Sequence, residues 1–163
     1  IPTIAMVNGV AVGAGFDIAL ACDMRIGCEN SRFKVAWTSR ALTTAFGTTW
    51  FLPRIVGVGI AAELIFTARM VEAQEAQQLH ILNRLIPAKD LQTETMTLAD
   101  QLAKGPPLAL RLSKANIYKG LELNLDTALA LLASDQSQLF LSDDFVEATK
   151  AFQEKREPVF KGQ

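Results

Sequence analysis

The chain has 163 residues, of which 50% are hydrophobic, and its 16 Lys and Arg residues nearly balance 17 Asp and Glu residues, giving a formal net charge of −1. This length suits one ordinary domain, or most of one, with a sizeable core. The balanced charge and a charged fraction of only 20% exclude a general nucleic-acid-binding protein, a collagen-like chain and a disordered regulator.

The residue types that build most metal and redox sites are sparse. Cys22 and Cys28 form a single C-x5-C pair in an apolar segment, which indicates reduced, half-buried thiols rather than a disulfide framework or metal ligands. His80 is the one histidine and lies in an expected helical context, so we interpret it as a structural or surface residue. The sequence therefore predicts no metal site.

The first residues carry no targeting signal. The run from Ile1 to Val7 is apolar but has no basic region before it, and Asn8-Gly9 ends it far short of the roughly 18 residues of a membrane span. The chain also lacks an initiator Met and begins like a strand in mid-sheet. We therefore expect an incomplete or processed chain of a soluble, cytoplasmic protein with no membrane partner.

Taken in chain order, the first third predicts short strands joined by small-residue turns. Residues 4–7 form an apolar run bounded by turn residues, which is typical of a buried strand. The step Gly13-Ala14-Gly15 then opens a helix, and such a turn lets a ligand approach the backbone closely. Further extended segments are predicted at residues 23–27 and 32–36, with a turn at residues 29–31 between them.

The remaining two thirds predict mainly helices. Gly105 and the two prolines after it end one helix and open the next. The expected elements are a helix through Trp50–Leu52, helical residues 60–66, a helix starting at residues 71–76, a strand-like return at 82–86, helices at 91–103, 108–119 and 125–140, and a last helix capped by residues 142–144 and running to residue 152.

Two stretches at opposite ends of the chain carry distinctive motifs. Residues 2–26 match the pattern P-x-I-A-x-V-x-G-x-A-x-G-G-G-x-E/D-L-A-x-x-C-D-x-R-I, with Ala14 in place of the middle glycine. Residues 151–162 match A-F-x-E-K-R-x-P-x-F-x-G. With these motifs, nearly the whole chain resembles the crotonase superfamily, the enoyl-CoA hydratase/isomerase family. Shorter matches lie between them in the expected order, at residues 52–57, 82–87 and 106–109.

The resemblance implies an α/β fold in two parts. Residues 1–90 would be the later part of a crotonase-like spiral of ββα units, truncated at its N-terminus, and residues 91–163 a helical trimerisation region. It also implies an acyl-CoA thioester as the substrate and a homotrimer or hexamer as the assembly. No cofactor is implied beyond the coenzyme A that the substrate itself carries.

The resemblance also implies how the thioester would be bound. Its oxygen would become an enolate-like oxyanion held by two backbone N–H groups, a kind of contact worth several kcal/mol. One donor falls at Ala14, next to Gly13, at a helix N-terminus whose dipole adds to the effect. The other belongs to an earlier strand-to-helix turn, which precedes this chain. Phe152 and Lys155 match positions that contact the adenine and phosphates of the coenzyme A of a neighbouring subunit.

The acid/base positions depart from the family pattern. The two hydratase glutamates fall at Asp17, a shorter carboxylate, and at Trp37, which cannot transfer a proton; a third position, an aspartate in dienoyl-CoA isomerases, falls at Ala45. We expect Trp37 and Ala45 to line the acyl group. Asp17 is either a general acid/base or a first-turn residue that stabilises the helix N-terminus.

Two functions stay open at this point. The first is an acyl-CoA enzyme of the hydratase/isomerase family, and the second is a non-catalytic acyl-CoA-binding or scaffolding relative.

Asp143 and Asp144 are expected to form a helix N-cap rather than a site. Hydroxyl groups that could hold a water or an acyl group near the empty carboxylate positions are those of Ser39, Thr43, Thr44, Thr48 and Thr49.

Overall fold

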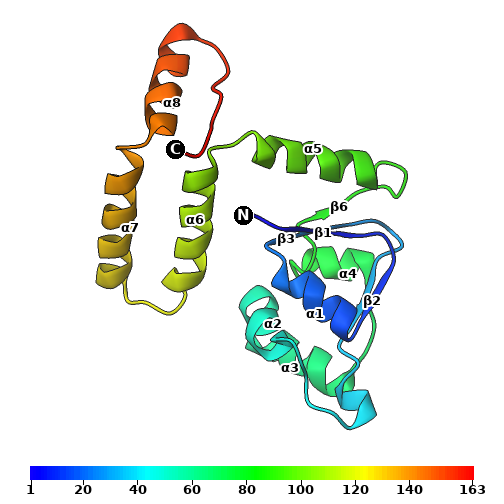
Figure 1. Ribbon diagram of the computed structural model, residues 1–163. Helices are drawn as coiled ribbons and strands as arrows, with labels where there is room; N and C mark the ends of the chain where they lie inside the picture. Colours follow the sequence, from blue (N-terminus) through cyan, green and yellow to red (C-terminus); the bar gives the residue numbers. More distant parts are fainter. The chain divides into compact units, whose positions relative to one another are not determined.

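A computed structural model describes residues 1–163 and shows a mixed α/β chain (Figure 1). It divides into two compact units, residues 3–98 and residues 99–163 with residues 1–2. The boundary between the units falls inside a helix. The division predicted after residue 90, into a spiral core and an oligomerisation region, stays a prediction.

Residues 3–98 contain two small sheets. The first has the strand order β1-β3-β6, and all its pairs are parallel: β1 (Ile4–Val7), β3 (Met24–Gly27) and β6 (Arg84–Leu85). The second has the order β2-β4-β5, in which β2 pairs parallel and β5 antiparallel with β4: β2 (Val10–Val12), β4 (Arg32–Lys34) and β5 (Val71–Glu72).

Helices surround the larger of two apolar clusters in this unit, and the smaller one is centred on Ile26, Cys28 and Leu91. The rings of Phe16 and Phe33 lie 5.2 Å apart between centroids, and both side chains are fully buried. Leu52 and Leu64 join this cluster from two further helices. The helical elements are α1 (Ala14–Ala21), the 3-10 turn η1 (Thr38–Arg40), α2 (Thr48–Val56), α3 (Val58–Thr67), α4 (Ala73–Gln78) and α5 (Leu91–Ala103), which begins in this unit.

A buried arginine fixes the C-terminal end of α1. The guanidinium of Arg25 donates from Nε to the Ile81 carbonyl and from a terminal nitrogen to the Cys22 carbonyl, each at 2.7 Å. Carbonyls at a helix end have no partner within the helix, and a cation is favourable there. The orientation of α1, and hence of its first turn, is set by this anchor together with the packing of α1 beside β2 and α2 (Figure 1).

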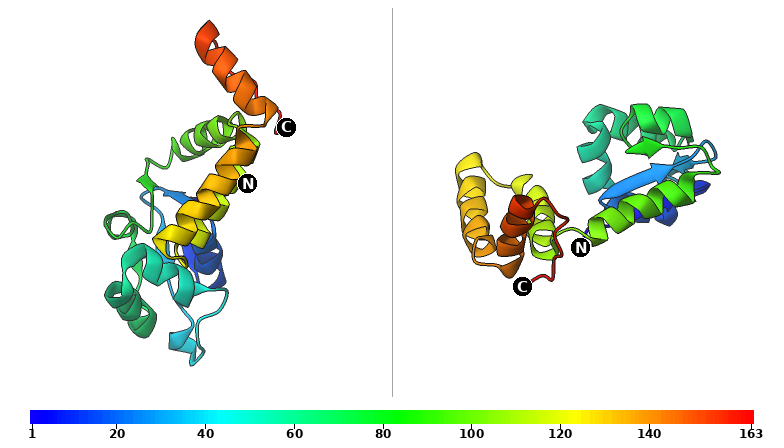
Figure 2. Two further views of the ribbon diagram at one scale, coloured as in Figure 1. Left: turned by 90° about the vertical axis from the view of Figure 1, so that its left-hand side faces the viewer. Right: turned by 90° about the horizontal axis from the view of Figure 1, so that it is seen from above.

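Residues 99–163 are helical. Helices α6 (Pro107–Gly120) and α7 (Leu125–Leu139) lie side by side as a hairpin in all views, and α8 (Asp143–Glu154) follows (Figures 1 and 2). The C-terminal segment folds back along α8, because the buried carboxylate of Asp144 accepts the backbone N–H groups of Lys161 at 2.7 Å and Gly162 at 2.9 Å.

The sequence predictions hold for most elements. The strand at residues 4–7 and the helix at residues 91–103 are confirmed to the residue. His80 is a correction, because it lies in a turn after α4 with φ 60° rather than in a helix. The helix expected from residue 71 begins at Ala73, since the two preceding residues pair as β5.

The start of α8 also differs from expectation. Ser142 is the N-cap, and its hydroxyl accepts the N–H of Phe145 at 3.2 Å. Asp143 and Asp144 therefore follow the cap in the first turn instead of forming it. The Asp144 carboxylate binds the C-terminal segment, a long-range contact that local spacing does not reveal. Of the two free thiols, Cys22 is half-buried as expected, whereas Cys28 is fully buried.

Candidate active site

The first turn of α1 is shaped by a glycine in an unusual conformation. Gly13 is the N-cap of α1 with φ 54° and ψ −122°, a region that side chains rarely allow. Its N–H donates to the Lys34 carbonyl at 3.0 Å, which ties the turn to β4. Ala14 follows as the first helical residue. Its N–H is one of the helix donors that have no acceptor within the helix, so it is free to bind an external oxygen.

Asp17 is fully buried in the same turn and accepts two hydrogen bonds. Its Oδ2 accepts the indole Nε1–H of Trp37 at 2.9 Å, and its Oδ1 accepts the hydroxyl of Thr48 in a short hydrogen bond. The carboxylate thus joins α1 to the segment after β4 and to the start of α2. Asp17 lies in the first turn of α1, where one of the two expectations placed it as a residue that stabilises the helix N-terminus. Its side chain also makes tertiary contacts with Trp37 and Thr48, which neither expectation included.

Trp37 lies between this network and the surface. Its ring carbons come within 3.9 Å of the position that a Cβ on Gly13 would occupy, and its ring lies 6.2 Å from that of Phe46 between centroids. Trp37 is half-buried, whereas Phe46 is 67% exposed. An aromatic surface therefore lies directly beside the Gly13–Ala14 turn. That placement suits the wall of an apolar pocket.

Ala45, at the position expected to match the third family carboxylate, offers no titratable group. Ala45 is half-buried, and its carbonyl accepts the Thr48 N–H at 3.2 Å. Of the hydroxyls expected to face the acyl group, Thr48 is fully buried against Asp17, and Ser39 donates to the Ala36 carbonyl at 2.8 Å. The roles of Thr48 and Phe46 escaped sequence reasoning. The one local signal for them is the Phe-Gly-Thr step that begins α2.

Phe152 and Lys155 lie at the end of α8, in the other unit. Phe152 is 85% exposed, which is unusual for a phenylalanine. Lys155 is the C-cap of α8 with φ 55°, and its N–H donates to the Phe152 carbonyl at 3.3 Å. The two residues are thus neighbours on one helix end, and both side chains are free to contact a ligand or a second chain.

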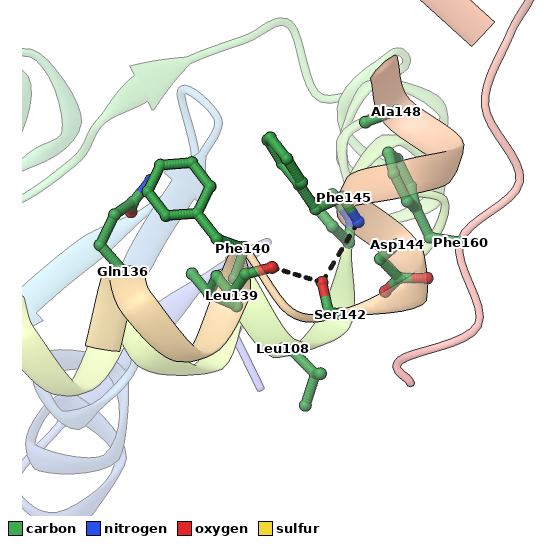
Figure 3. Close-up of a pocket in the computed structure, with 11 residues that line it drawn as sticks. Leu108, Gln136, Leu139, Phe140, Ser142, Asp144, Phe145, Ala148 and Phe160 are labelled. Atoms are coloured by element: carbon green, nitrogen blue, oxygen red, sulfur yellow. Dashed lines mark hydrogen bonds between the residues drawn. The ribbon is translucent and has the colours of Figure 1, made fainter. Parts of the chain in front are cut away.

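Two hollows adjoin these elements. One, of about 430 Å³, runs along β1, the following turn and α1, and is lined by Met6, Gly15 and Ile18 among others. The other, of about 230 Å³, lies within residues 106–160 and is lined mainly by apolar side chains (Figure 3). Figure 3 shows the rings of Phe140, Phe145 and Phe160 among the side chains that line it.

Two further classes of feature are absent. No group of three or more His, Cys, Asp or Glu side chains is placed to hold a metal ion. No helix is both long and apolar enough to span a bilayer.

Comparison with known proteins gives a consistent result. The sequence profile described as enoyl-CoA hydratase/isomerase matches residues 1–163. The short-chain-enoyl-CoA hydratase of Clostridium acetobutylicum is 38% identical over 155 residues, which are 95% of this chain and 59% of that enzyme. The crotonyl-CoA hydratase of Syntrophomonas wolfei is 36% identical over 159 residues, 98% of this chain and 61% of that enzyme.

Solved structures agree with the sequence comparison. The crystal structure of an enoyl-CoA hydratase from Bacillus anthracis superposes with a TM-score of 0.96 at 36% identity, covering 99% of this chain and 63% of that one. One from Streptomyces coelicolor, described as a putative enoyl-CoA hydratase, gives 0.95 at 36% identity, covering all of this chain and 60% of that one. This chain therefore spans about three fifths of the length of the proteins it matches.

Proposed function

This chain belongs to the enoyl-CoA hydratase/isomerase family, and from that premise we propose that the protein acts on acyl-CoA thioesters by stabilising an enolate oxyanion. The observation that carries the proposal is the Gly13–Ala14 turn at the start of α1, where a backbone N–H has no partner in the helix. A donor fixed where negative charge develops stabilises the transition state by about 3–4 kcal/mol. The helix dipole acts in the same direction.

The same proposal assigns the remaining site residues. Trp37, Gly13 and Ala45 would line the acyl group beside the oxyanion, and Phe152 and Lys155 would contact the coenzyme A bound by a neighbouring subunit. The second oxyanion N–H would come from an earlier turn of the family fold. We expect no separate cofactor, because the substrate itself carries the coenzyme A.

Asp17 is the proposed proton-transfer group, and its geometry sets a condition on that role. A carboxylate offers about four acceptor positions, of which the hydrogen bonds from Trp37 and Thr48 occupy two. The other two positions are open to a proton, but the side chain is fully buried, so a substrate proton reaches them only if the residues that cover Asp17 move. Hydration or double-bond isomerisation with one such carboxylate is the reaction class we propose.

A second candidate function rests on a specific observation. Two of three family carboxylate positions are occupied by Trp37 and Ala45, and the third, Asp17, is fully buried with both oxygens bonded. This arrangement favours a relative that binds acyl-CoA without turning it over. The two candidates share the Ala14 donor and differ in whether a bound thioester reacts.

Assembly as a homotrimer, or a hexamer built from trimers, is part of the proposal. Helix α7 exposes large apolar side chains in its first half at Leu125, Leu129 and Leu132, which are spaced i, i+4 and i+7 on one face. Exposed apolar patches of this kind commonly mark protein–protein contacts. This helix face supports an assembly through the helical region.

The test is crotonyl-CoA turnover by the full-length gene product and its Ala14→Pro variant. Proline is tolerated at the first position of a helix and removes only the N–H in question. We expect kcat to fall about 10²- to 10³-fold in Ala14→Pro, and Ala14→Gly, which keeps the N–H, to stay within about threefold of wild type. Calorimetric binding of crotonyl-CoA without any turnover would support the non-catalytic candidate instead.

A further inference from the structure

Three side chains from separate elements converge in one buried network. Asp17 of α1 accepts from Trp37, which follows β4, and from Thr48, the first residue of α2. Asp17 and Thr48 are both fully buried, and Trp37 is the one member that reaches the surface. Asp17 and Thr48 are buried by this chain alone. Any other chain or segment that packs against it could only reduce their exposure, so their burial does not depend on such contacts.

The backbone before Thr48 adopts a costly conformation. Phe46 has φ 49° and Gly47 has φ 87°, so two consecutive residues occupy the left-handed region, one of them with a bulky side chain. Such a conformation costs of order 1–3 kcal/mol at a non-glycine residue and persists only where the surroundings maintain it. Here it turns the chain so that α2 begins with the Thr48 hydroxyl against Asp17.

The Thr48 hydroxyl has one proton and two acceptors within reach. Its Oγ1 lies 3.2 Å from the Ala45 carbonyl oxygen and much closer to Oδ1 of Asp17. Since hydrogen bonds to a charged acceptor are the stronger ones, the proton is donated to the carboxylate. Thr48 and Trp37 thus hold the two oxygens of Asp17 from different sides and leave the side chain one orientation.

This orientation bears on the first turn of α1. Asp17 lies three residues after Ala14, and its own N–H donates to the Gly13 carbonyl at 3.0 Å. We propose that Thr48 is a positioning residue for the acyl-CoA reaction, because its hydroxyl fixes Asp17 and thereby holds the turn that presents the Ala14 N–H. The inference rests on the proposed function, since it concerns the same donor. It adds to the site a residue for which the family motif gives no role.

The test compares Thr48→Val with Thr48→Ser in the full-length gene product. Valine keeps the shape and removes the hydroxyl, whereas serine keeps the hydroxyl. Thr95→Val is the matched control, because Thr95 is a buried threonine of α5 whose hydroxyl has no hydrogen-bond partner. The measured quantities are kcat and KM for crotonyl-CoA and the amide hydrogen exchange of residues 13–20.

We expect Thr48→Val to lower kcat about 10- to 100-fold with KM within about twofold, since small displacements of a catalytic donor act at this scale. We also expect faster exchange in residues 13–20, recovery of kcat in Thr48→Ser, and wild-type kcat in Thr95→Val. A wild-type kcat in Thr48→Val, or a Thr48→Ser variant as slow as Thr48→Val, overturns the inference.

Two further outcomes are a Thr48→Val variant that does not fold and a wild-type protein that turns over no acyl-CoA. If Thr48→Val does not fold, Thr48→Ala decides, because it removes the same hydroxyl without putting a methyl group in its place; unchanged kcat and exchange then overturn the inference. If the wild-type protein turns over no acyl-CoA, the proposed function itself fails. In that case a positioning role in catalysis fails with it, whatever the exchange data show.

Discussion

The indole N–H of Trp37 donates to Oδ2 of Asp17 at 2.9 Å, across 20 residues of chain. From the family resemblance, we expect these two residues to stand at the positions of the two hydratase glutamates. The pair that would share proton transfer in a hydratase is therefore a donor and an acceptor bonded to each other here. A tryptophan N–H only donates, so the pair stabilises the fold around Asp17 whatever chemistry the site performs.

Replacing Asp17 by asparagine tests that structural contribution. The amide has one acceptor oxygen, so one of the donors from Trp37 and Thr48 would face an NH₂ group in a buried site. We expect the free energy of unfolding in urea to fall by about 1–3 kcal/mol. In a double-mutant cycle with Trp37→Phe, we expect a coupling energy of about 0.5–3 kcal/mol.

The control for that substitution is Asp126→Asn in α7, where the aspartate is an exposed first-turn residue. A first-turn carboxylate that acts only through the helix dipole contributes about 0.3–1 kcal/mol. Equal losses in both variants, with no coupling to Trp37, would contradict the tertiary role of Asp17.

Helix positions followed well from the sequence because their signals are local. Gly105 and Pro106 mark the break between α5 and α6, and the periodic apolar residues of α5 gave both of its ends. The positions of the short strands were harder to predict from the sequence. β2 and β5 have three and two residues, too short for an alternation pattern, and they exist because β4 supplies backbone partners from elsewhere in the chain.

The candidate site was predictable at the backbone and less so at the side chains. The helix N-terminus at Ala14 follows from the Gly13-Ala14-Gly15 step alone. The contacts of Asp17 with Trp37 and Thr48 join residues 20 and 31 positions apart, and nothing local encodes them. Hydroxyl-bearing residues before and at the start of α2 were expected to lie near the acyl group, whereas tertiary packing buries Thr48 against the carboxylate.

Gly27 in β3 tolerates no side chain. A Cβ there would lie 2.6 Å from Oγ of Ser31 and 2.8 Å from a methyl group of Leu82. Ser31 cannot move away, because its hydroxyl donates to the Val7 carbonyl at 2.6 Å and accepts the Cys28 N–H at 2.8 Å.

We therefore expect Gly27→Ala to lower the free energy of unfolding by about 1–3 kcal/mol, measured by urea denaturation. Gly59→Ala is the control, because that position in α3 has open space around it. It should be neutral or stabilising by up to about 1 kcal/mol. Similar behaviour of the two variants would show that the space at Gly27 is not limiting.

The C-terminal segment should stay attached to α8 in acid. Arg156 donates two hydrogen bonds to the Glu147 carboxylate, at 2.6 and 2.9 Å, and the Val159 N–H adds a third at 2.9 Å. Mainly through the Arg156 contact, the pKa of Glu147 falls from an ordinary 4.5 to about 2. Because the folded pKa is the lower one, this stabilisation is fully present above about pH 4.5 and is lost as the pH falls through about 2.

The measurement is an NMR titration of the Val159 amide signal. We expect its midpoint near pH 2 in the wild type, and a midpoint shifted up towards 4.5 in Arg156→Gln, where the main cause is removed. A wild-type midpoint already at pH 4–5 would mean that the Arg156–Glu147 pair does not persist in solution.

The exposed leucines of α7 predict the assembly. Leu129 is 53% exposed at the middle of the face that it shares with Leu125 and Leu132, whereas Leu131 and Asp135 lie on a more buried face. If that exposed face packs against a second copy of the chain, a carboxylate at its centre would have to be buried without a partner, which costs several kcal/mol.

We therefore expect the full-length gene product to sediment as a trimer or hexamer and Leu129→Glu to sediment as a monomer. Ser134→Glu places the same charge on another exposed side of α7 and should leave the assembly intact. A wild-type monomer at micromolar concentration, or a Leu129→Glu variant that still assembles, would refute the proposal that this helix face joins the subunits.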